Sequence, residues 1–256
     1  MSEPFRPNEL MAIAAAREIK DSDIVFCGTG LSIVAARTAK KMYAPKSIIF
    51  FETGAIDSPL WDLPMFVADS RVMAGAAIHT GLIDAFSMLQ NKKTGPRTVS
   101  ILGGAQIDRF GNLNSTCIGN YAFPSVRFAG SGGASDAASL AGRIIVFIKH
   151  DRTRFVEKLD YLTSPGWMEG GTSRCSEGLR LGGIAVVITD KCVIRFRESE
   201  KSMYVSDYFP GCDVRSIAED TGFELDISQA RKIRPPGPEE LRILREEVDS
   251  EKLIIS

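Results

Sequence analysis

The chain has 256 residues, 44% of them apolar, and its 31 basic and 32 acidic residues leave a formal net charge of −1. A chain of this length can bury a full core, and its balanced charge gives no electrostatic footprint for nucleic acid. No apolar run approaches the ~20 residues that cross a bilayer, and the N-terminus lacks the apolar segment of a signal peptide. Five scattered cysteines without a Cys-x-x-Cys pair are typical of reduced thiols, so we expect a cytoplasmic protein without a metal site.

The first hundred residues alternate between helix and strand signals. Apolar spacing predicts a helix from Asn8 or Glu9, a strand over 23–27, a tight turn at 28–30 and a helix over 31–43 that ends before Pro45. A second strand follows over 47–51. Residues 55–80 contain several prolines and glycines and predict a loop with short elements, followed by a helix over 82–90 and a strand over 97–102.

The second part of the chain adds strands that favour antiparallel pairing. Residues 108–112 predict a hairpin connection into a strand over 113–118, and a helix over 134–140 leads into a strand over 143–149. The segment 170–183 has five glycines and no periodicity, which predicts a mobile surface excursion. A hairpin over 184–196, a strand over 203–209 and helices over 213–222 and 238–248 complete the chain. We therefore predict one α/β domain over residues 1–256, with an open mixed sheet, mainly parallel at its centre, flanked by helices and extended by antiparallel strands.

The segment Ser47-Ile-Ile-Phe-Phe-Glu52-Thr-Gly54 places one carboxylate at the end of a strongly apolar strand. Such a strand is typical of the interior of a parallel sheet, and open α/β sheets place their chemistry at the carboxyl ends of their strands. Burial of a carboxylate without donors costs several kcal/mol. Glu52 is therefore either a strand-end acid that meets solvent or a functional group.

Two glycine-rich segments accompany this glutamate. They are Gly103-Gly-Ala-Gln106-Ile-Asp108, which continues to Asn114, and Gly130-Ser-Gly132-Gly133-Ala-Ser135. Each exposes backbone N–H groups that no side chain blocks, which suits the oxygens of a phosphate or the oxyanion formed when a carbonyl is attacked. Each segment alone is equally consistent with a turn. Only His79 and His150 supply imidazoles, which argues against a histidine-based triad, and a structural role is favoured for both.

This combination resembles the small (β) subunit of the family I CoA-transferases, and within them the glutaconate CoA-transferase branch. The resemblance runs in one order along most of the chain. Its motifs are Cys27-Gly-Thr-Gly30, Tyr43-Ala-Pro45, Glu52-Thr-Gly54, Gly103-Gly-Ala-Gln-Ile-Asp108, Gly111-Asn-Leu-Asn114, Arg127-Phe-Ala-Gly-Ser-Gly-Gly-Ala134, Asp160-Tyr-Leu-Thr-Ser-Pro-Gly-Trp167 and Thr221-Gly-Phe223.

The resemblance implies a CoA-transferase (NagB/RpiA-like) fold and a covalent role for Glu52. Attack of a carboxylate on an acyl-CoA gives an acyl–glutamyl anhydride, which remains as activated as the thioester. CoA can then move to Glu52 and on to a second carboxylic acid, such as a dicarboxylate of the glutaconate type. CoA enters as a substrate thioester, and no permanently bound cofactor is expected.

The resemblance also implies roles for residues of the glycine-rich segments. The amides of Gly132 and Gly133 are candidates for the oxyanion site, and Gly130 and Arg127 for binding CoA. Asn114 and Gln106 are candidates for substrate binding or for orienting the nucleophile. A capped turn for Asn114 and a purely structural loop for Gln106 remain open.

Members of this branch are one half of an enzyme, so the resemblance implies an α-type partner subunit in a heterotetramer or hetero-octamer. A closing partner would exclude water from the anhydride. It would also cover Phe50, Phe51 and the apolar residues around Trp61, Leu63 and Met65, which otherwise risk exposure as a patch.

Two alternatives stay open at this stage. The same fold also serves acyl-CoA hydrolysis, ring cleavage or decarboxylation, although relatives of that kind generally lack a glutamate at the position of Glu52. A non-catalytic regulatory or effector-binding role is the second alternative, and the complete set of Glu52 and the Gly-x-Gly-Gly loop argues against it.

Overall fold

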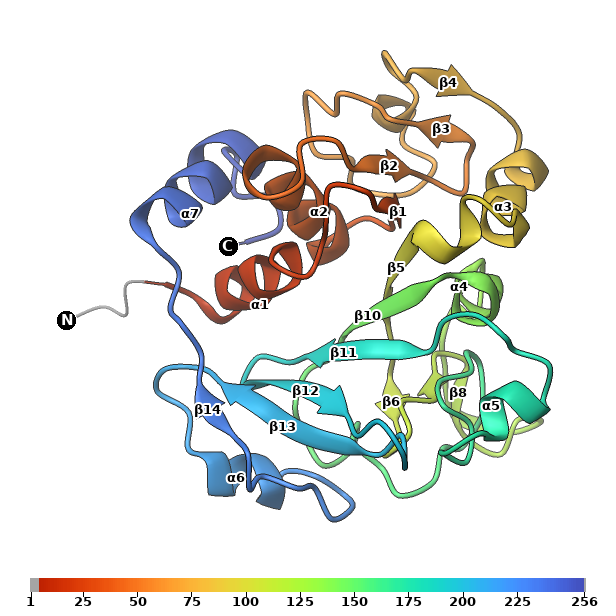
Figure 1. Ribbon diagram of the computed structural model, residues 1–256, viewed down its shortest axis with the longest axis vertical. Helices are drawn as coiled ribbons and strands as arrows, with labels where there is room; N and C mark the ends of the chain where they lie inside the picture. Colours follow the sequence, from red (N-terminus) through yellow and green to blue (C-terminus); the bar gives the residue numbers. More distant parts are fainter. Residues whose placement is uncertain (1–4, 256) are drawn as a thin grey trace. The chain divides into compact units, whose positions relative to one another are not determined.

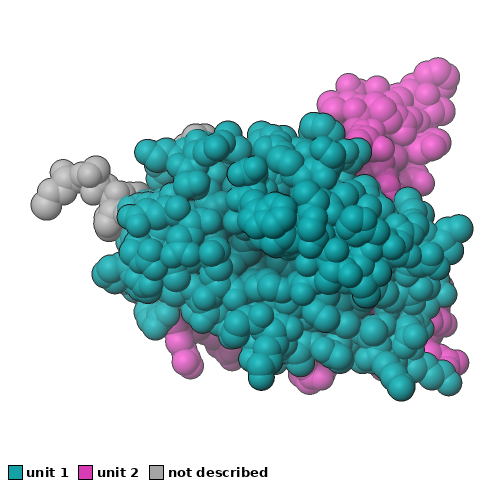
Figure 2. Space-filling view, turned by 90° about the horizontal axis from the view of Figure 1, so that it is seen from above, with its two compact units in different colours: residues 1–101, 234–256 teal, residues 102–233 magenta. Residues whose placement is uncertain are grey.

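The computed structural model describes residues 5–255. The chain forms two compact units. Residues up to 101 together with those from 234 onward make unit 1, and residues 102–233 make unit 2 (Figure 2). The C-terminal segment therefore returns to the unit in which the chain begins. The single domain over residues 1–256 stays a prediction.

Three parallel strands form the centre of the sheet in unit 1. β1 (Ile24–Phe26) lies between β2 (Ile48–Phe50) and β5 (Thr98–Gly103), with Phe26 opposite Phe50 on one side and Ser100 on the other. Two short antiparallel strands, β3 (Ala55–Ile56) and β4 (Ile78–His79), extend the sheet beyond β2. β1 is buried along its whole length, as expected of a parallel strand that is covered on both faces.

The helices of unit 1 come from both ends of the chain. They are α1 (Pro7–Ala16), α2 (Leu31–Met42), α3 (Leu82–Gln90), the 3₁₀ turns η1 (Ser70–Val72) and η2 (Gly95–Arg97), and α7 (Pro238–Arg242), which continues as the π-helical η3 (Ile243–Val248). α1 and η3 both pack against α2, and Figure 1 shows the blue C-terminal helix beside the red and orange N-terminal ones. α1 begins at Pro7, slightly earlier than predicted, because proline fits the first helical position.

Unit 2 is richer in antiparallel pairs. β10 (Arg143–Phe147) runs parallel to β11 (Ile184–Ile188), and β12 (Cys192–Phe196) and β13 (Met203–Tyr208) follow in antiparallel order, with β14 (Arg231–Lys232) parallel to β13. Two separate hairpins pair β6 (Gln106–Ile107) with β7 (Leu113–Asn114) and β8 (Cys117–Gly119) with β9 (Pro124–Arg127). The helices are α4 (Ala134–Leu140), α5 (Ser173–Ser176) and α6 (Val214–Glu219). The predicted α/β class, with a parallel centre and antiparallel additions, is confirmed.

The predicted strand over 113–118 is wrong as a single element. β7 ends at Asn114, the chain turns, and β8 starts at Cys117 to pair with β9. The side chain of Asn114 causes the break, since its Oδ1 accepts hydrogen bonds from the N–H groups of Thr116 and Cys117. An asparagine that bonds to the backbone ahead of it favours a turn over an extended strand.

The predicted excursion over 170–183 runs largely at the surface, where residues 175–178 are exposed, and its mobility stays a prediction. Arg174 is only 3% exposed, and its guanidinium donates to the carbonyls of Gly166 at 2.8 Å, Ala138 at 2.8 Å and Leu181 at 2.8 Å. Burial lowers the pKa of Arg174 to about 10. One buried cation therefore fastens a segment that has no apolar periodicity of its own. No helix among residues 5–255 is long and apolar enough to cross a membrane.

Candidate active site

Glu52 occupies the tight turn that joins β2 to β3 in unit 1. Phe51 N–H donates to Ala55 O, and Gly54 N–H donates to Phe51 O, both at 3.0 Å. Gly54 has φ +98°, and a Cβ there would lie 1.9 Å from Thr80 O, so only glycine fits the turn. The turn is thus fixed by its backbone, and it carries Glu52 at the carboxyl end of β2 as the sequence predicts.

The carboxylate of Glu52 is available for chemistry. The residue is half-buried, and its side chain makes no hydrogen bond or ion pair with any residue from 5 to 255. The preceding Phe50 and Phe51 are fully buried in this chain. Their burial anchors the start of the turn. The expectation that a partner subunit is needed to cover these two side chains is therefore wrong.

A buried hydroxyl lies next to Glu52. Thr53 Oγ1 is buried and has no hydrogen-bond partner among the described residues. Unpaired buried polar atoms are uncommon in native proteins, and a role in a functional site is one explanation for such an atom. Nothing in the sequence distinguishes this threonine from an ordinary turn residue.

In unit 2, the structure brings Gln106 and Asn114 together. Asn114 Nδ2 donates to Gln106 Oε1 at 2.7 Å and to Cys117 O at 2.7 Å, and Asn114 has no exposed surface. Gln106 Nε2 in turn donates to Asp160 Oδ2 at 2.8 Å. Asp160 is a third member that the sequence analysis did not assign, although it opens the motif Asp160-Tyr-Leu-Thr. The amide of Asn114 is fully used inside the unit, which matches the capped-turn alternative.

The turn after Asn114 is hydrogen-bonded to the start of the second glycine-rich loop, at Gly130. Ser115 O accepts from Gly130 N–H at 3.1 Å, and Ser115 Oγ donates to Gly130 O at 3.1 Å. Phe128 N–H also donates to Thr116 O at 2.9 Å. The two glycine-rich segments of the sequence are therefore linked directly: the first ends in the turn that fixes the start of the second.

The glycine loop itself presents free backbone donors. Gly130 has φ +89° and Gly132 has φ +50°, whereas Gly133 has φ −79° and caps the start of α4. A Cβ at Gly130 or Gly132 would meet no atom within 4 Å, so backbone conformation, rather than lack of space, favours glycine there. The N–H groups of Gly132 and Gly133 donate to no residue in the described part of the chain. Unpaired backbone N–H groups are one element that an oxyanion site requires.

Arg127 lies in β9 and is engaged by its own hairpin. Its guanidinium stacks over the ring of Tyr121, with Cζ 4.7 Å from the ring centroid, and Nη2 donates to Tyr121 O at 2.6 Å. Tyr121 also stacks on Tyr161, with ring centroids 5.2 Å apart. A role for Arg127 or Gly130 in binding CoA stays a prediction.

His150 is a core residue of unit 2. It is 1% exposed, its Nε2 lies 3.0 Å from both Ile217 O and Thr221 Oγ1, and its ring stacks on Phe155 at 4.2 Å. Burial lowers the pKa of His150 to about 4. The imidazole is therefore neutral at pH 7 and structural. Within residues 5–255, no group of three or more His, Cys, Asp or Glu side chains could hold a metal ion.

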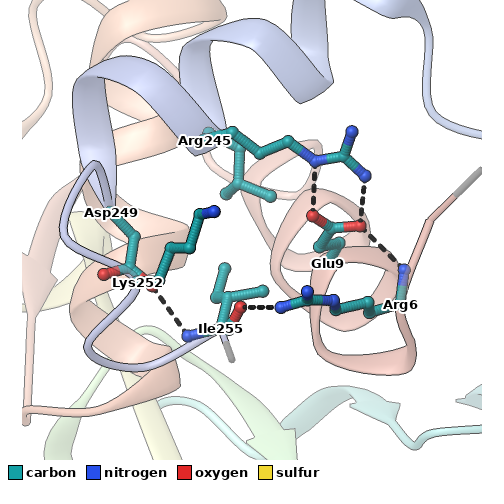
Figure 3. Close-up of a pocket in the computed structure, with 7 residues that line it drawn as sticks. Arg6, Glu9, Arg245, Asp249, Lys252 and Ile255 are labelled. Carbon is teal, nitrogen blue, oxygen red and sulfur yellow. Dashed lines mark hydrogen bonds and ion pairs between the residues drawn. The ribbon is translucent and has the colours of Figure 1, made fainter.

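A pocket of about 200 Å³ in unit 1 lies beside the start of α1 (Figure 3). Glu9 accepts from Arg245 Nε at 2.7 Å and Nη2 at 2.8 Å and from Arg6 N–H at 2.7 Å. Asp249 accepts from the N–H groups of Leu253, Ile254 and Ile255. Both carboxylates are saturated by donors from the same segments, and none of the predicted site residues lines the pocket. We interpret it as a clasp between α1 and the C-terminal segment.

Comparison with known proteins identifies the family. Residues 8–220 match the family model described as Coenzyme A transferase. The chain is 39% identical to the B subunit of glutaconate CoA-transferase from Acidaminococcus fermentans over 96% of this chain and 93% of that protein. It is 34% identical to the B subunit of 3-oxoadipate CoA-transferase from Pseudomonas knackmussii over 94% of this chain and 92% of that protein. The chain therefore belongs to the CoA-transferase family.

The likeness to a solved structure extends over the whole fold. The crystal structure of glutaconate CoA-transferase from A. fermentans matches with a TM-score of 0.95 and 36% identity, and the match covers 99% of this chain and 98% of that chain. The predicted family, the CoA-transferase fold and the transferase class of enzyme are thus confirmed. Both curated relatives are B subunits, and this chain is a B-type subunit of the family.

Proposed function

We propose that this chain carries the nucleophile of a CoA-transferase that moves CoA from an acyl-CoA to a carboxylic acid, with Glu52 as the attacking group. The observation that carries the proposal is the unengaged carboxylate of Glu52 at the end of buried β2, on a turn that Gly54 fixes. A group held by a rigid backbone and free of internal partners is suited to form a covalent bond with substrate.

The reaction proceeds through two covalent intermediates. The Glu52 carboxylate attacks the thioester carbonyl, the carbon–sulfur bond breaks, and CoA leaves as a thiolate with an acyl–glutamyl anhydride behind. The thiolate then attacks the glutamyl carbonyl, which releases the first acid and leaves CoA on Glu52 as a thioester. A second carboxylate enters, and the same two steps run in reverse. No metal and no ATP take part, because each intermediate stays activated.

Each step passes through a tetrahedral oxyanion, for which the amides of Gly132 and Gly133 are the proposed donors. Their N–H groups are free within unit 2, and the loop is anchored at Ser115. One such donor is worth about 3 kcal/mol in the barrier. Asn114 and Gln106 support the site indirectly, since their side chains hold the turn to which the glycine loop is tied. The joining of Glu52 and this loop in one site is part of the proposal.

The acid substrate is proposed to be a dicarboxylate of the glutaconate or 3-oxoadipate type. The support is the names of the two curated relatives, which share 39% and 34% identity with nearly the whole chain. The partner is an A-type subunit, and the assembly is proposed to be a heterotetramer or a hetero-octamer. Hydrolysis, ring cleavage and decarboxylation are less favoured, because a free glutamate at position 52 serves transfer rather than those reactions.

The proposal is tested by co-expression of this chain with the A-type subunit of the same organism. The purified pair is assayed with acetyl-CoA as donor and with glutaconate, 3-oxoadipate and butyrate as acceptors. We expect CoA transfer to a dicarboxylate, and we expect Glu52→Gln to lower turnover by about 10³-fold or more. Release of free CoA without transfer to any acid would instead support the hydrolase alternative.

A further inference from the structure

The hairpin formed by β8 and β9 exposes an unusual amount of apolar surface. Phe123 is 88% exposed and Tyr121 57%, and four further residues of the hairpin and its neighbouring segment are 36–46% exposed. We define the aromatic hairpin patch as Tyr121, Phe123, Val126, Phe128, Tyr161 and Leu162. At about 200 Å² for each full side chain, the exposed part is roughly 500–600 Å², at the upper end of the ~300–600 Å² that the largest apolar patch of a typical monomer covers.

The patch is held in place by internal contacts. The β8–β9 ladder pairs Cys117 with Arg127 and Ile118 with Val126. Arg127 stacks over Tyr121 and donates to its carbonyl, and Tyr121 stacks on Tyr161. An ordered apolar surface loses little entropy when it is covered, so it is prepared for binding.

The composition of the patch is that of a protein interface. Four of its six residues are aromatic, and the cation beside it, Arg127, lies on an aromatic ring. Aromatic residues and arginine are enriched at the centres of protein interfaces. The exposed area also approaches the ~800 Å² that each partner contributes to a standard protein–protein interface. A two-stranded hairpin offers a raised surface, which suits a protein better than a small ligand.

We propose that the aromatic hairpin patch is a docking surface for the A-type subunit, and that docking orders the glycine loop. This inference rests on the proposed function. β9 ends at Arg127, three residues before Gly130, and the base of the same hairpin holds the loop through the bonds of Phe128 N–H to Thr116 O and Gly130 N–H to Ser115 O. A partner seated on the hairpin is therefore coupled to the loop that presents the Gly132 and Gly133 amides. We commit to the A-type subunit and not to a second copy of this chain, because the proposed reaction needs the A-type subunit and docking at this hairpin would couple its arrival to the glycine loop.

Binding of Phe123→Asp to the A-type subunit tests the docking surface. Phe123 is almost fully exposed, so the substitution leaves the isolated fold intact, while an aspartate in a covered apolar interface is costly. We expect the dissociation constant for the A-type subunit to rise at least tenfold. Leu181→Asp is the control, because Leu181 is also an exposed apolar residue of unit 2 and lies outside the patch.

Hydrogen exchange provides the second measurement. Addition of the A-type subunit to wild-type chain is expected to slow exchange at the amides of Gly132 and Gly133, and Phe123→Asp is expected to abolish this effect at matched concentrations. Equal affinity of Phe123→Asp and wild type for the A-type subunit would overturn the proposal. A Phe123→Asp variant that loses only self-association, and still binds the A-type subunit normally, would overturn it as well. Binding is measured without substrate. A pair that binds through the patch but transfers no CoA would contradict the proposed function and leave the docking surface standing.

Discussion

Gly133 differs from the other glycines of its loop in having an ordinary backbone conformation. Its φ of −79° and ψ of 0° are accessible to any residue, whereas Gly130 and Gly132 have positive φ. A side chain at Gly133 therefore tests the space above the amide without straining the backbone. A side chain at Gly132 would both occupy this space and strain the backbone, so the two effects could not be separated.

Gly133→Val is expected to fold normally and to lower kcat by about 10²-fold or more, because the side chain would block access to the proposed oxyanion donors. The measurement is steady-state CoA transfer by the purified two-subunit enzyme, with the thermal midpoint of each variant as a check on folding. Gly237→Val is the control, since Gly237 also caps a helix with negative φ, and a Cβ there makes an ordinary 3.4 Å contact. Equal turnover in the two variants would refute the assignment.

Gly170 is not a suitable control for this experiment. It looks like a loop glycine in the sequence, but it is buried, has φ +85°, and a Cβ there would lie 2.5 Å from Glu200 O. The sequence shows that a glycine is present, whereas only the tertiary structure shows whether the chain requires it. The same limit applies to Asn114, whose motif could be recognised but whose bonds to Gln106 and Cys117 could not.

At the scale of elements, helices and strands with strong local sequence signals could be predicted from the sequence. α3 and α4 have the predicted bounds, and β11 and β12 form the predicted hairpin, because apolar periodicity and turn residues coincide there. The β8–β9 hairpin was missed, since an exposed edge with Pro124 and several outward aromatics shows no alternation of buried and polar residues. The buried contacts of Arg174 within 170–183 could not be predicted either, because the segment has no apolar periodicity that would indicate an anchored residue.

Within unit 1, a buried carboxylate attaches the C-terminal segment to the N-terminal part of the chain. Glu240 accepts hydrogen bonds from Arg17, Arg234, Tyr43 and the N–H of Gly237. Burial alone would raise the pKa of Glu240, but these donors outweigh it and lower the pKa to about 2. Because the folded pKa lies below the ordinary 4.5, the stabilisation is complete above about pH 4.5 and is lost as the pH falls toward 2.

Glu240→Gln is therefore expected to lower the free energy of unfolding by about 2 kcal/mol at pH 7, since the neutral amide has no charge to pair with the arginines and keeps only one acceptor oxygen. Urea unfolding of both chains at pH 7, 4 and 3 measures the effect. The difference between wild type and variant should shrink steadily below pH 4.5. A difference that is the same at pH 7 and pH 3 would show that the charge of Glu240 contributes nothing.

At the scale of the whole molecule, two groups of exposed apolar residues bear on partner binding. Leu63 is buried with Phe50 and Phe51, but Trp61 is 72% exposed and Met65 49%, so the predicted patch of unit 1 survives in part. The aromatic hairpin patch of unit 2 is the second group. Partner contacts could be anticipated from the family but not located, because exposure depends on how the whole chain folds.

The proposed reaction depends on one carboxylate, that of Glu52. Glu52 was predicted from the strand that precedes it, and the structure adds that the residue is half-buried and its carboxylate unengaged within residues 5–255. A carboxylate in this state is suited to act as a nucleophile. Formation of the covalent intermediate is the step that distinguishes transfer from the other reactions of this fold.

The most direct test is mass spectrometry of peptides from the co-expressed enzyme after incubation with acyl-CoA in the absence of an acceptor acid. We predict that the peptide containing Glu52 carries CoA as a thioester. Addition of the acceptor carboxylic acid should remove the CoA, and Glu52→Gln should prevent formation of the thioester. Full CoA transfer by Glu52→Gln, or a CoA adduct on a different residue, would contradict the account.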